Sequence, residues 1–274
     1  MAARAKPEIP RRAVDVAVEV AVQDVAGVLI AQAAGADRVE LCVGLAATGG
    51  LTPPIGLIEA AVATGLPVHP LIRTRPGGFC YDAAELDVLV RDVRAAVRGG
   101  AAGVVVGALS SLGEVDEEAL RAFVDAAGGA CVTFHRAFDV VLDQRASLDQ
   151  RASLDRLADL GVTRVLTSGG ATTAIEGRGA LVALAAHARA AGARVQVMAG
   201  GGVRVQDIGA LIEAGVDAVH LSARRPAPDA GTSGPGGGSG GYDVTDEATV
   251  RAAVTAAAAP AAPPPTLHPP TRQT

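Results

Sequence analysis

The sequence predicts a single (β/α)₈ barrel, the TIM-barrel fold. Eight short apolar segments that read as strands alternate with helical patterns, and 274 residues match the roughly 250 that are typical of this fold. The chain contains four Phe, two Tyr and no Trp, so its core must be built mainly from Val, Leu, Ile and Ala. Branched aliphatic side chains are typical of parallel strands that are buried beneath helices.

Four of the eight expected strands share one pattern, in which a helix-ending glycine and small or polar residues precede a Val-rich segment. The pattern occurs as GADRVELC, GAAGVVVG, GVTRVLTS and GVDAVHLS, which begin at Gly35, Gly100, Gly161 and Gly215. The other four strands are expected over residues 14–22, 68–73, 132–135 and 195–199. A doubly wound sheet is less favoured, because the glycine-rich run AGGGV comes late and lacks the G-x-G-x-x-G spacing.

Helices are expected between the strands. The clearest runs from Asp82 to Val97, where Asp82 and Glu85 form a D-x-x-E cap and apolar residues recur on one face. The tandem copy QRASLD at residues 144–155 interrupts the regular alternation. Because six residues are not a whole number of helical turns, we expect an extended loop there, or one extra turn at the start of a helix.

The barrel domain is expected to span residues 14–258, between two segments without regular structure. Residues 1–13 are expected to be flexible, and the Pro-rich residues 259–274 to form a disordered tail. Within the domain, residues 226–241 read PAPDAGTSGPGGGSGG and contain too little apolar surface to offset the entropy of ordering. This segment is expected to be a flexible loop.

Composition and charge exclude several classes of partner. The formal net charge is −5 and Lys6 is the only lysine, so nucleic acid is not expected as a partner. No stretch approaches the roughly 18 continuous apolar residues of a membrane span, and the first residues contain no apolar signal segment. The three cysteines, Cys42, Cys80 and Cys131, are an odd number at unrelated spacings. A cytoplasmic protein with free thiols is therefore predicted.

Alternation along the strands separates core residues from candidate site residues, because successive side chains point to opposite faces. In the second strand Val39 and Leu41 share one face, which leaves Glu40 and Cys42 directed into the barrel. Active sites of this fold lie at the C-terminal ends of the strands, so inward polar groups predict a pocket there. Its expected members are Glu19, Glu40, Cys42, His135, Ser168, His220 and Ser222, with Arg73, Arg75, Arg136 and Asp139 from the segments after the third and fifth strands.

A purely structural interpretation stays open for the two inward carboxylates. A buried charge needs a partner whether or not it takes part in chemistry, so Glu19 and Glu40 could each be paired with an arginine. Structural ion pairs of this kind also shift pKa values.

Several motifs, in their order along the chain, resemble the CutC family. They are GADRVELC from Gly35, GGLTP from Gly49, PVHPLIRTRPGGFCY from Pro67, VTFHRAFD from Val132, RVLTSGG from Arg164, MAGGGVR from Met198 and HLSAR from His220. The resemblance covers the chain from about Val18 to Arg224. It implies a barrel that is commonly a homo-oligomer and a link to copper homeostasis, with Cu(I) binding attributed to some members.

The first functional hypothesis is Cu(I) binding at the C-terminal mouth of the barrel, because Cu(I) prefers thiolate or thioether ligands. The family pattern often places a cysteine two residues after the first-strand Glu, where this chain has Ala21. Cys42 matches the family's other cysteine position. A two-thiolate site would need a second ligand, for which Cys80 from the following loop is a candidate. Met198, His135 and His220 are further candidate ligands, although none has a diagnostic spacing.

The alternative hypothesis is an isomerase, epimerase or hydrolase that acts on a small anionic substrate, possibly a phosphorylated one. Backbone N–H groups after the seventh strand, at Gly200, Gly201 and Gly202, are typical of phosphate binding in such barrels. A Schiff-base aldolase is excluded because Lys6 lies before the first strand. The expected catalytic residues are Glu19, Glu40, Arg73, His135 and Asp139, and the expected substrate-binding residues are Arg75, Arg136, Ser168, Gly200, Gly201, Gly202, His220, Ser222 and Arg224.

Overall fold

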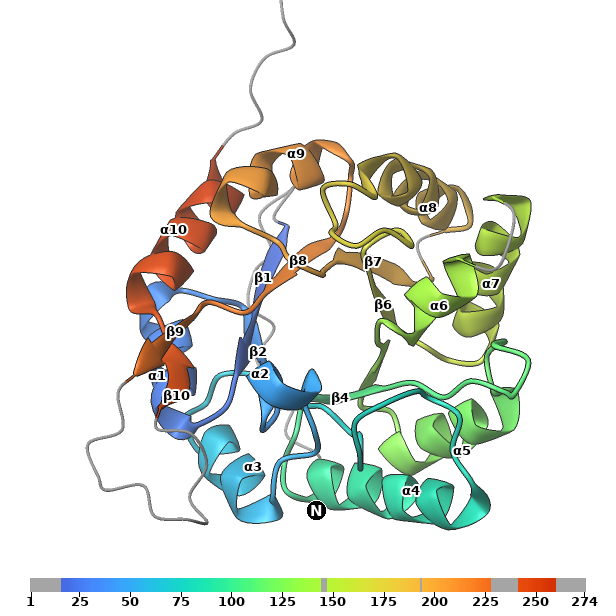
Figure 1. Ribbon diagram of the computed structural model, residues 1–274, viewed down its shortest axis with the longest axis horizontal. Coiled ribbons are helices and arrows are strands. Elements are labelled where there is room, and N and C mark those ends of the chain that lie inside the picture. The colour runs from blue at the N-terminus through green and yellow to red at the C-terminus, as the bar shows by residue number, and fades with distance from the viewer. Residues whose placement is uncertain (1–15, 144–146, 193, 228–240, 260–274) are drawn as a thin grey trace, which may run out of the picture.

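A computed structural model describes residues 16–143, 147–192, 194–227 and 241–259. Eight parallel strands follow the order β3-β2-β1-β8-β7-β6-β5-β4. The ring closes between its two ends, where Ala102 N–H donates to the Val68 carbonyl (3.0 Å) and Ile72 N–H donates to the Val105 carbonyl (2.8 Å). Figure 1 looks along the barrel, with the strands as an inner ring and the helices outside them. The predicted (β/α)₈ barrel is confirmed.

All eight predicted strands overlap observed ones, although most observed strands are shorter. The observed strands are β1 (Ala17–Val22), β2 (Arg38–Leu41), β3 (Val68–Pro70), β4 (Gly103–Val106), β5 (Cys131–Phe134), β6 (Arg164–Thr167), β7 (Gln196–Ala199) and β8 (Ala218–Leu221).

The outer layer consists of helices that follow the strands in turn. They are α1 (Val25–Ala34), α2 (Leu45–Thr48), α3 (Ile55–Val62), α4 (Ala83–Arg98), α5 (Glu117–Ala127), α6 (Ala137–Asp143), α7 (Ser147–Asp159), α8 (Arg178–Ala190), the 3₁₀ turn η1 (Val205–Asp207), α9 (Ile208–Glu213) and α10 (Glu247–Ala258). Within the described ranges, none of these helices has the length and apolar character needed to cross a membrane.

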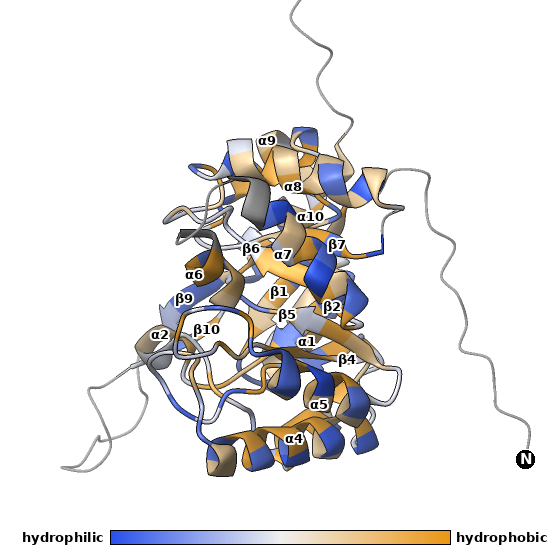
Figure 2. Cartoon of the chain, turned by 90° about the vertical axis from the view of Figure 1, so that its right-hand side faces the viewer, coloured by the Kyte–Doolittle hydropathy of each residue, from blue (hydrophilic) through white to orange (hydrophobic). Residues whose placement is uncertain are grey.

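Helix α4 begins with the capping box that its sequence predicts. Glu85 N–H donates to the Asp82 side chain (2.8 Å), and Asp82 N–H donates to the Glu85 side chain (2.9 Å). Hydrophobic and hydrophilic residues alternate along α4 and α5 (Figure 2). Their apolar faces bury Leu89 and Phe123 against the barrel. This amphipathic pattern is what a helix covering a sheet requires.

The main core lies between the strands and the helices. Val39, Leu41, Val132 and Phe134 belong to it, all fully or almost fully buried. The opposite strand faces fill the barrel with smaller apolar clusters, one of which joins Leu166, Met198 and Ala218. Buried polar side chains share the barrel interior with these clusters, among them Arg38 and Arg164 at the starts of β2 and β6.

Two local features of the structure bear on the sequence-based expectation. Residues 147–155 of the tandem copy belong to helix α7, which agrees with the helical alternative, and residues 144–146 lie outside the described residues. An antiparallel hairpin, β9 (Arg224–Ala227) and β10 (Tyr242–Thr245), occupies the ends of the expected loop. Residues 226–227 are therefore strand. Residues 228–240 of that segment, residues 1–13 and nearly all of the tail lie outside the described residues.

Candidate functional site

A cavity of about 270 Å³ opens where the strands end. Arg73 follows β3, His135 and Arg136 follow β5, and Gly201 follows β7, so its walls come from segments far apart in the sequence. The predicted site residues that line it are Glu40, Arg73, His135, Arg136, Gly201, Gly202, His220 and Ser222.

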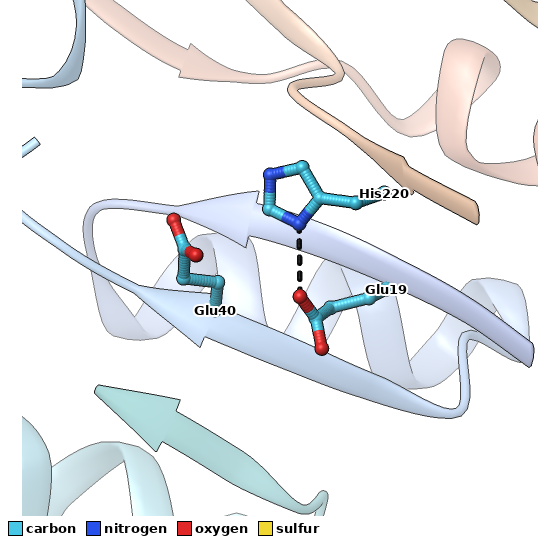
Figure 3. Close-up of side chains that lie close together, drawn as sticks. All are labelled: Glu19, Glu40 and His220. Carbon is cyan, nitrogen blue, oxygen red and sulfur yellow. Dashed lines mark hydrogen bonds and ion pairs between the residues drawn. The ribbon is translucent and has the colours of Figure 1, made fainter. Parts of the chain in front are cut away.

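A glutamate–histidine pair forms beneath this cavity because of the strand register. Glu19 lies opposite His220 on the neighbouring strand β8, and opposite Arg38 on the other neighbour, β2. The Nδ1–H of His220 donates to Oε1 of Glu19 (2.8 Å), as Figure 3 shows. Nε of Arg38 donates to Oε2 of the same carboxylate (2.5 Å). One completely buried carboxylate therefore holds a cation on one side and an imidazole on the other.

The pKa shifts of this pair favour an ionised Glu19 carboxylate and a protonated His220 imidazole. Burial alone would raise the pKa of Glu19, but Arg38 and His220 hold it well below its usual range. Burial would likewise lower the pKa of His220, and the Glu40 and Glu19 carboxylates outweigh that effect and raise it. The structural interpretation of Glu19 as a paired buried carboxylate therefore agrees with the geometry. His220 keeps its Nε2 free of this pairing.

Glu40 lies beside the pair but does not share its partners (Figure 3). One side-chain atom each from Glu19, Glu40 and His220 lie within 4.8 Å of one another. Among the described residues, no hydrogen bond or ion pair reaches the Glu40 carboxyl group. Burial raises its pKa to about 7; His220 opposes that rise and Glu19 adds to it. Glu40 is thus able to gain and release a proton near neutral pH.

Arg73 brings positive charge to the cavity wall. Its two terminal nitrogens donate to the backbone carbonyls of Thr48 (2.7 Å), Gly50 (3.2 Å) and Gly77 (2.7 Å). The guanidinium also lies 5.3 Å from the centre of the Phe79 ring. No carboxylate of the described residues pairs with Arg73, so its charge is fixed in position and not neutralised.

The turn after β7 supplies uncommitted backbone donors. Gly201, Gly202 and Val203 line the cavity, and none of their N–H groups donates to another described residue. Gly201 has a φ of 100°, and a Cβ there would lie 2.9 Å from Cζ of Arg136, so this turn requires glycine. Successive free N–H groups of this kind form a concavity suited to anions.

Asp139 has a supporting position rather than a place on the cavity wall. Its carboxylate accepts hydrogen bonds from Thr167 Oγ1, Ser168 N, Ser168 Oγ and Gly170 N, at 2.5 to 3.2 Å. Nε of Arg136 adds a further bond at 2.7 Å. Asp139 thereby joins the segment after β5 to the turn after β6. Arg136 also donates to Ser168 Oγ (3.0 Å), which holds its guanidinium near the turn after β7.

The remaining predicted site residues lie apart from the cavity. Arg75 pairs with Glu85, and Arg224 pairs with Asp243 of the hairpin (2.5 Å). Gly200 donates its N–H to the Thr167 carbonyl and so continues the strand pairing (2.9 Å).

The two predicted thiols are not brought together at the cavity. Cys42 is completely buried against Leu71 and Val105. Burial raises the pKa of the Cys42 thiol, and Glu40 adds to that rise. Cys80 is exposed on the loop after β3 and lines a separate hollow with Ser110.

Arg38 and Phe79 contribute to the site although the sequence analysis did not select them. Arg38 shares the alternation of Glu40 and Cys42 on the same strand, so the face rule could have identified it. Phe79 lies on a loop, where no period indicates the direction of a side chain.

Comparison with known proteins identifies the family. The CutC family model matches residues 16–225. The chain belongs to the CutC family. A protein named CutC from Caulobacter vibrioides is 46% identical over 217 residues, which cover 78% of this chain and 84% of that protein. One from Xanthomonas campestris pv. campestris is 45% identical over 245 residues, 86% and 96% of the two chains.

Solved structures agree with this assignment. A CutC protein from Streptococcus agalactiae is 32% identical, with a TM-score of 0.68, and the match covers 75% of this CutC-family chain and 97% of that one. A deoxyribose phosphate aldolase from Aeropyrum pernix matches with a TM-score of 0.56 over 75% and 85% of the two chains. Its identity is 21%, so that likeness concerns the fold alone.

Proposed function

We propose that this CutC-family chain is an enzyme that transfers protons on a small anionic substrate bound at the C-terminal mouth of the barrel, as an isomerase, epimerase or hydrolase does. One observation carries the proposal. Glu40, whose pKa is raised to about 7, lies beside a His220 that Glu19 holds in one orientation, and Glu40 and His220 line the same cavity. Two titratable groups with shifted pKa values at one site are typical of acid–base catalysis.

The two groups have separate tasks in this proposal. The hydrogen bond from Nδ1–H to Glu19 fixes the ring of His220. The Glu40 and Glu19 carboxylates raise the pKa of His220 and so favour its protonated form, in which Nε2–H donates a proton or a hydrogen bond to substrate. Glu40 accepts a proton in its ionised form and returns one in its neutral form. Arg38 keeps Glu19 ionised and so acts through Glu19 rather than on the substrate.

Anion binding is assigned to the cavity walls. Arg73 offers a positive charge without a carboxylate partner, and the N–H groups of Gly201, Gly202 and Val203 offer neutral donors. Both kinds of group bind phosphate and carboxylate oxygens in proteins. A phosphorylated or carboxylated substrate matches this arrangement.

The test is thermal unfolding in the presence of inorganic phosphate, phosphoglycolate and pyruvate. A ligand at about 100 times its Kd stabilises a protein by about 2.7 kcal/mol, which raises the Tm of a chain of this size by roughly 5–10 °C. We expect such a shift for at least one anion in the parent chain and its loss in Arg73→Met, each measured against that protein's own Tm. Arg91→Met on α4, an exposed arginine, is the control. Absence of a shift in the parent chain, or an equal shift in Arg73→Met, contradicts the proposal.

Copper is the second candidate, and the name of the Streptococcus agalactiae relative connects CutC with copper homeostasis. The donor atoms of this chain do not fit Cu(I) at the cavity. The group that lies together consists of two carboxylates and one imidazole, whereas Cu(I) prefers sulfur. Arg38 would also have to compete with any cation for Glu19.

A chelator-competition titration tests the copper hypothesis on Cys42 and Cys80. We expect the parent chain and Cys42→Ala to compete equally and weakly for Cu(I), because the Cys42 thiol is buried and its pKa is raised. Tight binding by the parent chain that Cys42→Ala abolishes would instead establish the metal site. A cytoplasmic location and a homo-oligomeric state stay predictions of the sequence.

A further inference from the structure

His135 has an environment unlike that of the other cavity residues. Its ring follows β5 and lies between Gly107 and Phe79, with the Phe79 and His135 ring centres 4.6 Å apart. A Cβ at Gly107 would lie 2.3 Å from Cε1 of His135, so only glycine leaves room for the imidazole. His135 is 6% exposed, and its ring is held in place from both sides.

The hydrogen bonds of His135 decide which of its nitrogens carries the proton. Ala137 N–H donates to Nδ1 (3.1 Å), so Nδ1 must present its lone pair. The proton of the neutral ring therefore lies on Nε2. Burial, with the charge of Arg73 adding to it, lowers the pKa of His135 to about 3, so the imidazole stays neutral at physiological pH. His135 is a hydrogen-bond donor there rather than a base.

This donor lacks a partner. Nε2 of His135 is buried and forms no hydrogen bond within the described part of the chain, although the residue lines the cavity. An unpaired buried N–H costs free energy, which an acceptor atom of a ligand would recover. Phe79 shields the ring from bulk water, so a hydrogen bond formed here would be stronger than one in solvent.

We propose that Nε2–H of His135 donates to a carbonyl oxygen of the substrate, and that the substrate is therefore a small anion with a carbonyl group next to an acidic C–H bond. This inference rests on the proposed function and narrows its substrate class. Glu40 lies in β2 and His135 directly follows β5, and these two strands are three places apart around the ring. A ligand between them meets a base on one side and a neutral donor on the other, which is the arrangement that enolisation requires.

The step balances without a further reactant. The Glu40 carboxylate removes the proton from the carbon beside the carbonyl group, and the C–H electron pair forms a C=C bond. The π pair of the carbonyl moves onto its oxygen, which becomes an enolate oxygen hydrogen-bonded to His135. Return of the proton from Glu40 regenerates the carbonyl compound. If His220 instead gives its Nε2 proton to the carbon, the proton held by Glu40 must then pass to His220 to restore both groups, whose atoms lie within 4.8 Å of each other. The product is an epimer when the proton returns to the opposite face of that carbon. An isomer forms only if the substrate also carries a hydroxyl group on the neighbouring carbon, whose proton passes to the enolate oxygen.

The first test is a pH titration by NMR of the chain labelled with ¹⁵N in its histidines, with His135→Phe used to assign the signals. We expect the Nε2–H tautomer of His135 and no change in its ring nitrogen shifts between pH 5 and pH 8. Titration of His135 in this range, or a proton on Nδ1, overturns the inference.

The second test compares oxalate, a planar mimic of an enolate, with inorganic phosphate. We expect His135→Phe to bind oxalate at least about tenfold more weakly than the parent chain, because the lost hydrogen bond faces a charged oxygen, and to bind phosphate equally well. His135→Gln, which retains an N–H donor, should recover part of the oxalate affinity. Equal oxalate binding by the parent chain and His135→Phe overturns this inference but leaves the proposed function intact. Failure of the parent chain to bind any of these anions refutes the proposed function itself.

Discussion

The Glu40→Gln variant is expected to be more stable than the parent chain at pH 8, by about 3 kcal/mol, and equally stable at pH 4. The folded state raises the pKa of Glu40 from 4.5 to about 7. The fold therefore prefers the protonated carboxyl group, and stability present below pH 4.5 is lost as the pH rises through 7. Each pKa unit corresponds to about 1.4 kcal/mol. Glutamine resembles the protonated form and avoids this loss.

Urea unfolding at the two pH values measures the effect. Glu59→Gln, at an exposed position on α3, removes the same charge from the surface and is expected to change stability little at either pH. An unchanged or lower free energy of unfolding for Glu40→Gln at pH 8 would show that the carboxyl group has a partner in solution. A stabilising substitution at the centre of a cavity is typical of residues retained for activity rather than for folding.

Turnover of a substrate, once one is identified, should fall by about 10²- to 10⁴-fold in this variant.

Arg38→Met is expected to lower the free energy of unfolding at pH 7 by about 3–5 kcal/mol, because it leaves a buried carboxylate without its cation. Glu19 is completely buried and receives Nε of Arg38 at 2.5 Å, so water cannot replace the guanidinium. The parent chain keeps the pKa of Glu19 low, and the stability gained from this pairing is present above pH 4.5 and lost as the pH falls. The difference between variant and parent should therefore shrink in acid.

The matched control for this prediction is Arg91→Met on α4. Arg91 pairs with Asp87 at 2.8 Å, but both side chains are exposed, and such pairs contribute about 0–1 kcal/mol. Denaturant unfolding at pH 7 and pH 4 compares the two variants. Equal losses of stability in both would mean that the pairing of Glu19 and Arg38 is no stronger than a surface ion pair.

Most of the site residues that could be predicted were identified from the alternation of side chains along the strands. It directed Glu19, Glu40 and His220 into the barrel, and the structure brings atoms of these three within 4.8 Å of one another. It could not tell which carboxylate is paired, because that depends on the register between neighbouring strands, which alternation within one strand does not specify. Glu19 lies opposite Arg38 and His220, whereas Glu40 lies opposite His69 and Ala21.

Loops and their contacts were less predictable for a physical reason. Arg73 reaches carbonyl groups at the end of α2 and in its own loop, and Arg75, two residues later, pairs instead with Glu85 at the start of α4. No periodic pattern specifies such directions. The β9–β10 hairpin was missed for a related reason, since its strands are short, one contains Pro226, and their pairing is long-range.

The fixed guanidinium after β3 and the free amides after β7 belong to strands four places apart in a ring of eight, and so lie on opposite sides of the barrel mouth. The three backbone carbonyl groups that bind the Arg73 guanidinium prevent it from moving across the opening toward a short ligand. A molecule that contacts both Arg73 and these amides must bridge the whole width of the mouth. Molecular length, and not only charge, therefore becomes a criterion of selection.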